Sequence, residues 1–441
     1  MALAVIVCLA SFFWLLAIAR VNQFSFGLPI AYLFTLLLIH VPGAFAHIVG
    51  NDFLPDNDLT AIGIKLTAIG CVCFVVGVRL ARRSVPDNLS TEPVDRRTFS
   101  LFCVLGGWCV TYALSALHQY ASIGAVVDQA GYIWIIGVLL GLRRAVHIGD
   151  LKWVGIWLAA LGVYPVITLV SGGFMTWGYM TEIIVLSSLT ISTLSYRRAL
   201  IGITLTVILG MGVFTTYFLH RTEIRDQVWG GAPIADRVRS VVDAFSQFEW
   251  FDPRNPTHLE VLDDRLNQNY FVGAAAQRIQ DGQVGYLSGA TIWDGVLGLI
   301  PRALWPEKSV AVGSGNIVIS MTGLELDETA AWGVGSVMEF YINFGVWGII
   351  IGFLLLGWLI GTVDLRAALA ERQGKLGKLI LIFLPAPALM SPGGSVVDLT
   401  TAYAAGLIAA FGWKYAWEKW SAQRSRNPKL DRRHRSATVL S

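Results

Sequence analysis

Apolar residues fill long uninterrupted runs along most of this chain, and polar connections separate them. Many runs reach about 18 residues or more, the length at which a helix crosses a hydrocarbon core of about 30 Å. Backbone groups cannot stay unpaired in lipid, so each run predicts a helix. About eleven spans are expected, near residues 2–19, 27–46, 59–79, 99–116, 123–142, 153–171, 177–195, 199–219, 335–361, 377–391 and 398–414. The pattern predicts an all-α, polytopic integral membrane protein.

Lysine and arginine occur in every other connection between these runs. The connections near 47–58, 117–122 and 172–176 contain none. The basic connections carry Arg20, Arg79, Arg82, Arg83, Arg96, Arg97, Arg143, Arg144, Lys152, Arg197, Arg198, Arg366, Arg372, Lys375 and Lys378, followed by a basic tail. Because positive connections stay in the cytoplasm, we expect the N-terminus outside and the C-terminus inside.

Composition agrees with this class. Of 441 residues, 55% are hydrophobic and 14% charged, with a mean hydropathy of +0.60, which excludes an ordinary soluble protein. All five cysteines lie in apolar runs and are expected to be packing residues, so neither a disulfide scaffold nor a metal site is predicted. The first run lacks a basic segment before it and is expected to be a retained helix rather than a cleaved signal.

One long polar segment interrupts the pattern at residues 220–333. It contains nine basic and fifteen acidic residues, a difference of −6, and eight of the nine are arginines. The chain therefore divides into spans 1–8 (1–219), an extracytoplasmic loop (220–334), spans 9–11 (335–414) and a basic cytoplasmic tail (415–441). Within the loop, residues 259–279 predict a helix. Residues 292–304 are apolar but too short to span and predict an interfacial segment.

Several ionisable residues lie inside predicted spans, where a charge costs about 2.5–3.5 kcal/mol at the helix centre. With the orientation above, all fall near the outer ends of different helices, as do His40 and His47. A polar cavity opening outward would account for them, and snorkelling to the interface is the alternative. The residues are Lys65, Asp128, Glu182, Glu339 and Asp398.

Arginines in the loop suit a phosphate ligand, because guanidinium stays charged and grips phosphate oxygens in a fork. Arg221 and Arg225 leave a span one helical turn apart and share a face. Arg265 lies in a polar and aromatic patch, residues 263–270, suited to sugar hydroxyls. Arg302 follows an apolar run at headgroup depth. Solvated or ion-paired loop arginines are the plainer alternative.

Three groups are candidates for a general base: Glu339, Asp264 and His258. The acidic cluster at 325–328 is expected to be a solvated face rather than a metal site. The chain has no P-loop, no GxSxG elbow and no HExxH motif, and no cofactor is predicted. The aromatic and basic tail indicates a lipid-headgroup anchor and not a nucleic-acid site.

This arrangement resembles the Wzy-type polysaccharide polymerases, which are related to the O-antigen ligases. The likeness covers most of the chain in architecture: about a dozen spans with one large external loop before the last few. That family is associated with an arginine followed eleven positions later by glycine, which Arg302 with Gly313 and Arg278 with Gly289 match. Segments 301–308 (PRALWPEK) and 335–345 also resemble it. The family places arginines in two external loops, whereas all eight here lie in one.

The resemblance implies an inverting glycosyl transfer at the outer face of the bacterial cytoplasmic (inner) membrane. The donor would be a polyprenyl-diphosphate-linked oligosaccharide, without a nucleotide sugar. Arginines including Arg302, Arg265, Arg221, Arg225 and Arg278 would bind its diphosphate. The lipid bilayer, a flippase and a chain-length regulator are the implied partners, in the assembly of O-antigen, capsule or exopolysaccharide.

Three other functions stay open. A ligase would use the same donor with a different acceptor. A transporter or flippase of lipid-linked sugars would favour charges at the bilayer midplane, inverted repeats and short external loops. A non-enzymatic sensor or scaffold is the third.

Overall fold

The computed structural model describes residues 1–22, 24–50, 54, 57–82, 95–174, 176–192, 195–300, 305, 313–325 and 332–426. Its elements in chain order are α1 (Ala2–Asn22), α2 (Leu28–Val49), α3 (Asn57–Ala81), α4 (Arg96–Ala113), η1 (Ser115–Gln119), α5 (Ala121–Gly131), α6 (Ile133–Ile148), α7 (Leu151–Gly172), α8 (Thr176–Ser192), α9 (Tyr196–Trp229), α10 (Ile234–Ser246), α11 (Pro256–Leu266), α12 (Gln268–Gln280), α13 (Ala290–Gly298), α14 (Ser314–Thr322), α15 (Ser336–Arg372), α16 (Leu376–Phe383), η2 (Ala386–Met390) and α17 (Val396–Arg426). No strand occurs in these residues, so the predicted all-α class is confirmed for them.

Eight helical segments of the described residues are long and apolar enough to cross a membrane, and one of them, Ser122–Ile148, comprises α5 and α6 together. Two shorter apolar helices, Tyr179–Ile191 and Leu376–Met390, fall in two further predicted ranges. The remaining range, 99–116, is occupied by α4, which begins with two arginines and is not one of the eight. Every predicted apolar range is therefore helical, and the helices indicate a membrane-embedded protein.

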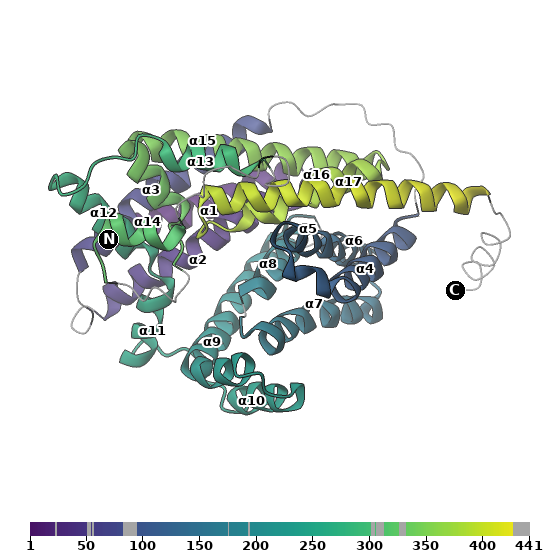
Figure 1. The fold of residues 1–441 in the computed structure, drawn as a ribbon, viewed down its shortest axis with the longest axis horizontal. Coiled ribbons are helices and arrows are strands. Elements are labelled where there is room, and N and C mark those ends of the chain that lie inside the picture. Colours follow the sequence, from purple (N-terminus) through teal and green to yellow (C-terminus); the bar gives the residue numbers. More distant parts are fainter. Residues whose placement is uncertain are drawn as a thin grey trace.

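Helices α1, α2, α3, α15, α16 and α17 lie together, and α4 to α9 form a second group beside them (Figure 1). Helix α10 lies at the edge of the second group, and α11 packs mainly against α2. Glycines make the closest contact of the first group possible. Gly63, Gly70 and Gly77 recur every seven residues along α3. A Cβ atom there would overlap, in turn, the backbone of α12 at Asn269, a ring in α15, and the α15 backbone at Leu354. Small residues of this kind let helix backbones approach in lipid.

A buried carboxylate of α15 holds the connection between α1 and α2. The side chain of Asp364 accepts hydrogen bonds from the Ser25 hydroxyl (2.6 Å) and from the backbone N–H groups of Phe26 (2.9 Å) and Leu28 (3.1 Å). It also pairs with Arg82 at the end of α3, at 3.0 Å. One residue thus links α1, α2, α3 and α15. Asp364 was not among the predicted intramembrane charges, because the predicted span ended at residue 361.

Helix α15 is not continuous. Phe344 (φ −141°) and Gly345 (φ +62°) leave helical geometry, and glycine tolerates that positive φ. The break frees the carbonyl of Ile342, which accepts the N–H of Leu287 at 2.9 Å. The first part of α15, before the break, is therefore tied to the segment before α13.

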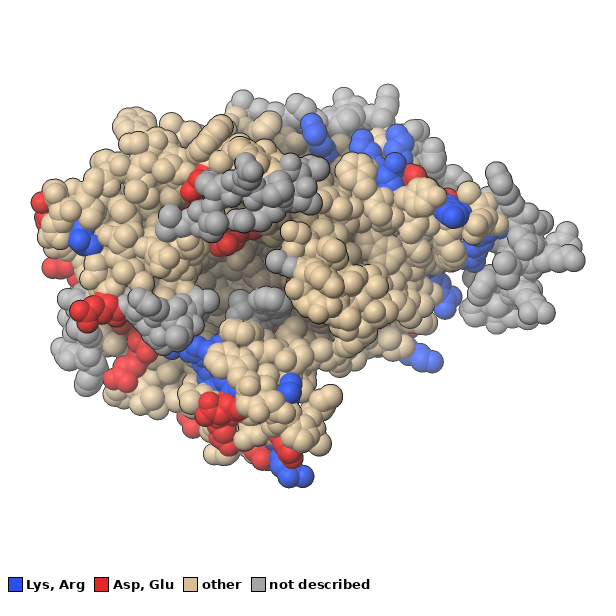
Figure 2. All heavy atoms as spheres, in the orientation of Figure 1, with Lys and Arg blue, Asp and Glu red and all other residues tan. Residues whose placement is uncertain are grey.

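Charge is segregated along the molecule. Figure 2 shows lysine and arginine side chains gathered at the end where α17 finishes, and aspartate and glutamate at the opposite end. This separation agrees with the alternation of basic connections in the sequence. Which side of a membrane each end faces stays a prediction.

Candidate functional site

Three arginines from two helices lie near one another, and two of them share one aromatic ring. The guanidinium of Arg221, in α9, lies 5.4 Å from the centroid of the Phe218 ring, and that of Arg265, in α11, lies 5.8 Å from the same ring. The positive charges of Arg265 and Arg225 both reach Arg221. No carboxylate of the described residues lies within 4.0 Å of these three guanidinium groups. We call Arg221, Arg225 and Arg265 the arginine cluster.

Aromatic rings and a backbone carbonyl fix the third member of the cluster. Arg225 lies over the rings of Phe174 (4.6 Å) and Trp229 (5.0 Å), and its Nε donates to the carbonyl of Gly173 at 3.4 Å. Cation–π contacts hold a guanidinium in place while leaving edge N–H groups for other acceptors. The cluster therefore has the positive charge and the free N–H donors that binding of an anion would require.

Helix length sets the depth of the cluster. Arg198 and Arg221 are 23 residues apart in the single helix α9. That separation corresponds to about 34 Å at 1.5 Å per residue. A hydrocarbon core is about 30 Å thick, so a membrane-spanning α9 puts both residues at headgroup depth on opposite sides. Figure 2 shows basic side chains where α9 meets α11, at the edge of a hollow on this face.

The junction between α11 and α12 is anchored in the bundle, which positions Arg265. Asn269, fully buried, donates from its amide to the carbonyl of His40 (2.6 Å), and its amide oxygen lies 2.8 Å from His40 Nδ1. Asn267 donates to the hydroxyl of Thr60 in α3 at 2.9 Å. The predicted helix over 259–279 is thus two helices, which separate at Asn267.

A histidine in the last turn of α2 adds a further contact to this anchor. His47 Nε2 lies 2.8 Å from the carboxylate of Asp263, which also accepts from Asn267. His47 is buried, and its Nδ1 has no hydrogen-bond partner. The patch at 263–270, predicted to grip sugar hydroxyls, therefore uses Asp263, Asn267 and Asn269 for internal bonds. Asp264 and Arg265 remain exposed.

Glu339, a predicted base, is fully buried at the start of α15. Its Oε2 accepts the N–H of Val396, the first residue of α17, at 2.7 Å, and its Oε1 has no hydrogen-bond partner. A helix N-terminus favours a negative charge, so α17 stabilises this carboxylate. The backbone carbonyl of Glu339 accepts a hydrogen bond from the side-chain amide of Asn343 at 2.7 Å. This contact places Glu339 beside the break in α15.

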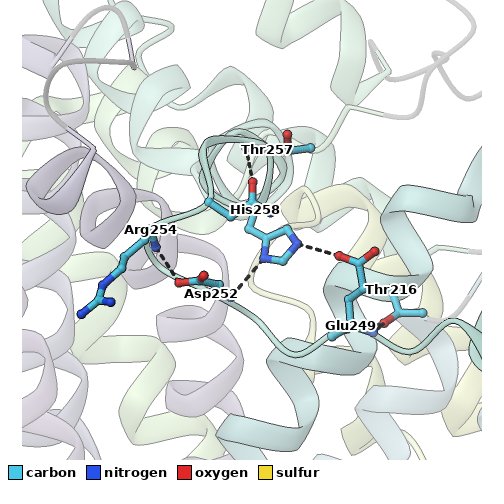
Figure 3. Close-up of polar contacts among 7 residues, drawn as sticks. Thr216, Glu249, Asp252, Arg254, Thr257 and His258 are labelled. Carbon is cyan, nitrogen blue, oxygen red and sulfur yellow. Dashed lines mark hydrogen bonds and ion pairs between the residues drawn. The ribbon is translucent and has the colours of Figure 1, made fainter.

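His258, another predicted base, has both ring nitrogens engaged (Figure 3). Nδ1 accepts the backbone N–H of Asp252 at 3.0 Å, which assigns the proton to Nε2, and Nε2 lies 3.1 Å from the carboxylate of Glu249. The Glu249 backbone in turn bonds to Thr216 of α9 at 3.0 Å. His258 thus ties the turn before α11 to α9, and taking up a further proton would require it to give up the Asp252 bond.

The remaining predicted anion ligands do not join the cluster. Arg278 donates to Gln283 (3.1 Å) and to the carbonyl of Ser320 (3.2 Å), so it ties α12 to the end of α14. Arg302 lies outside the described residues. Of the predicted cavity-lining residues, Lys65 and Asp128 are exposed and Glu182 is half-buried, on α3, α5 and α8. Those exposures fit both an open cavity and snorkelling.

Sequence reasoning missed Phe218, the ring that Arg221 and Arg265 share. Its spacing of three residues from Arg221 on one helix was the available signal. In the described part of the chain, no group of three or more His, Cys, Asp or Glu side chains is placed to hold a metal ion. No protein-family model matches the chain, and neither a curated protein nor a solved structure matches it.

Proposed function

We propose that this protein is a Wzy-type polymerase that joins oligosaccharide repeats carried on polyprenyl diphosphate, at the outer face of the bacterial cytoplasmic membrane. The observation that supports the proposal is the arginine cluster: three neighbouring guanidinium groups without a carboxylate partner among the described residues. If α9 spans the membrane, they lie at headgroup depth. Gathered cations of this kind are expected to bind an anion, and a diphosphate with several oxygens suits three forks.

The proposed step is a displacement at the anomeric carbon of the donor sugar. The acceptor hydroxyl oxygen forms the new glycosidic bond, and the bond from that carbon to the diphosphate oxygen breaks. The electron pair leaves with polyprenyl diphosphate, whose developing charge the arginine cluster stabilises. The hydroxyl proton passes to a base. Asp264 is the best placed of the three predicted bases, because it is exposed and precedes Arg265 on α11.

The test uses the purified full-length protein in nanodiscs with a lipid-linked repeat as the only substrate. Arg221→Ala and Arg265→Ala should each lower the rate of ladder formation about 100-fold or more, as removal of one donor to a developing oxyanion does elsewhere. Arg239→Ala is the matched control, because Arg239 lies on the adjacent helix α10 with 76% of its side chain exposed. Normal ladders from both cluster variants would contradict the proposal.

The same assay separates polymerase from ligase. A polymerase forms a ladder from the lipid-linked repeat alone, whereas a ligase forms none and transfers the glycan only when its own acceptor is added. Arg302→Ala belongs in the same series, since the resemblance makes Arg302 a diphosphate ligand. A chain-length regulator and a flippase are the proposed partners in the membrane.

A further inference from the structure

A small cavity lies at the basic end of the molecule, away from the arginine cluster. It has a volume of about 140 Å³ and is enclosed by the start of α4, the end of α6 and the start of α7. Arg97 and Arg144 line it from α4 and α6, and the indoles of Trp153 and Trp157 line it from α7. Buried Ser100 forms part of the wall. Nothing in the proposed transfer uses this cavity.

The two arginines in the cavity lack acidic partners. No carboxylate of the described chain lies within 4.0 Å of Arg97 or Arg144. Their neighbour Arg96 differs, because it pairs with Glu371 at 2.8 Å. The guanidinium of Arg97 lies 5.4 Å from the Trp153 ring centroid, which orients it beside the cavity. Two cations thus line one space without an ion pair to a described carboxylate.

The acids near the cavity already have other partners. Asp150 lines it, but its carboxylate accepts the N–H of Trp153 at 3.2 Å and caps α7. Asp95 lies within electrostatic reach of Arg144, and its carboxylate accepts the N–H and the hydroxyl of Thr98 at the start of α4. Both carboxylates cap helix N-termini and form no ion pair with Arg97 or Arg144, so the two arginines remain available to an added anion.

The surroundings identify the kind of anion. Three helices begin or end at this cavity, which is where the headgroups of a bilayer leaflet lie if those helices span. Leu101 and Ile148 add apolar side chains to the cavity wall, and both are exposed. Tryptophan is enriched at headgroup depth in membrane proteins. Basic pockets between membrane helices on the positive side bind anionic lipid headgroups.

We propose that Arg97 and Arg144 bind the phosphate of an anionic phospholipid, with its glycerol end beside Trp153 and its acyl chains along Leu101 and Ile148. The site holds α4, α6 and α7 together through the lipid. The inference does not depend on the function proposed above. A soluble phosphate ester offers the same headgroup chemistry, so the test must distinguish the two sources.

The full-length protein is purified in detergent, and phosphatidylglycerol bound to it is counted by native mass spectrometry, with phosphatidylcholine as the neutral comparison. Arg97→Gln/Arg144→Gln should weaken phosphatidylglycerol binding at least about tenfold, because two charge-assisted contacts are lost. Arg197→Gln/Arg198→Gln is the matched control: it removes two exposed arginines from the same predicted face, outside the cavity. Its binding should equal that of the wild type.

Equal loss in both double variants would overturn the proposal, because it would show a diffuse charge effect. Full displacement of phosphatidylglycerol by an equal concentration of sn-glycerol 3-phosphate would overturn the lipid assignment, because acyl contacts would then contribute nothing. Should the double variant not purify as a monodisperse protein, Arg144→Gln alone is used. It changes one exposed side chain and should still weaken phosphatidylglycerol binding several-fold, and unchanged binding would again overturn the site.

Discussion

Replacement of Asp364 by alanine should destabilise the protein far more than loss of an exposed ion pair. Asp364 is fully buried, and the Arg82 side chain beside it is 4% exposed. Nε and Nη1 of Arg82 have no hydrogen-bond partner, so the carboxylate is the group that compensates this cation. Its removal leaves a buried charge unpaired. It also orphans the backbone N–H groups of Phe26 and Leu28 at the start of α2.

The size of the effect follows from this burial. Removing one partner of a buried ion pair costs about 3–5 kcal/mol. Each orphaned buried donor costs about 1–3 kcal/mol in addition if it finds no water. We expect Asp364→Ala to lower the free energy of unfolding by about 4 kcal/mol or more. Glu371→Gln is the control on the same helix: its partner Arg96 is 44% exposed, so the loss should be about 1 kcal/mol or less.

Unfolding is followed by tryptophan fluorescence as sodium dodecyl sulfate is titrated into the full-length protein in dodecyl maltoside micelles. A loss for Asp364→Ala that stays within about 1 kcal/mol of the Glu371→Gln value would refute the reasoning. A double variant, Arg82→Leu/Asp364→Leu, removes the cation together with the carboxylate, so its comparison with Asp364→Ala measures the cost of the unpaired cation. It should be more stable than Asp364→Ala, because apolar residues of similar volume replace a buried pair at little cost.

Three further substitutions test other parts of the fold. Gly63→Ala should lower the free energy of unfolding by about 1–3 kcal/mol in the same titration, because its Cβ would overlap the backbone of Asn269. Gly155→Ala is the control and should be neutral or stabilising, because Gly155 lies in a helix with open space around it. Equal effects of the two substitutions would contradict the packing argument. Asn269→Ala should also lower the free energy of unfolding by about 1–3 kcal/mol, since it leaves buried His40 without its bonds to the Asn269 amide. An unchanged unfolding midpoint would show that these bonds do not anchor the α11–α12 junction. His258→Phe should expose the turn at 249–255 to trypsin, which cuts after Arg254, by freeing the N–H of Asp252; wild-type digestion rates would show that the ring bonds do not hold that turn.

The apolar runs predicted where helices occur but not where they end. Helix α9 was expected over 199–219 and extends from Tyr196 to Trp229. The hydropathy criterion stops at the polar residues near 220, yet a helix continues into water because its hydrogen bonds are internal. The run at 123–142 is divided at Tyr132 between α5 and α6. The break at Phe344–Gly345 was likewise not predicted, because glycine also occurs inside unbroken helices such as α7 and does not by itself mark a break.

Residue spacing predicted that two members of the arginine cluster lie together, and the resemblance named Arg265 beside them. Four-residue spacing put Arg221 and Arg225 on one face of α9, and the structure brings their charges together. Arg265 joins them from α11 because the α11–α12 junction is anchored against α2 and α3, which no local pattern predicts. The ion pair between Asp364 and Arg82 was not predicted for a related reason, because only the fold brings the two residues together.

The glycines of α3 have a consequence for how this protein can change over evolutionary time. Gly63, Gly70 and Gly77 stay on one side of the helix because their spacing matches two turns. A single inserted or deleted residue between Gly63 and Gly77 would rotate the far part of α3 by about 100°. Bulkier side chains would then meet α15 or α12. Homologous chains should therefore vary in the length of their polar connections while keeping the residue count of this stretch constant.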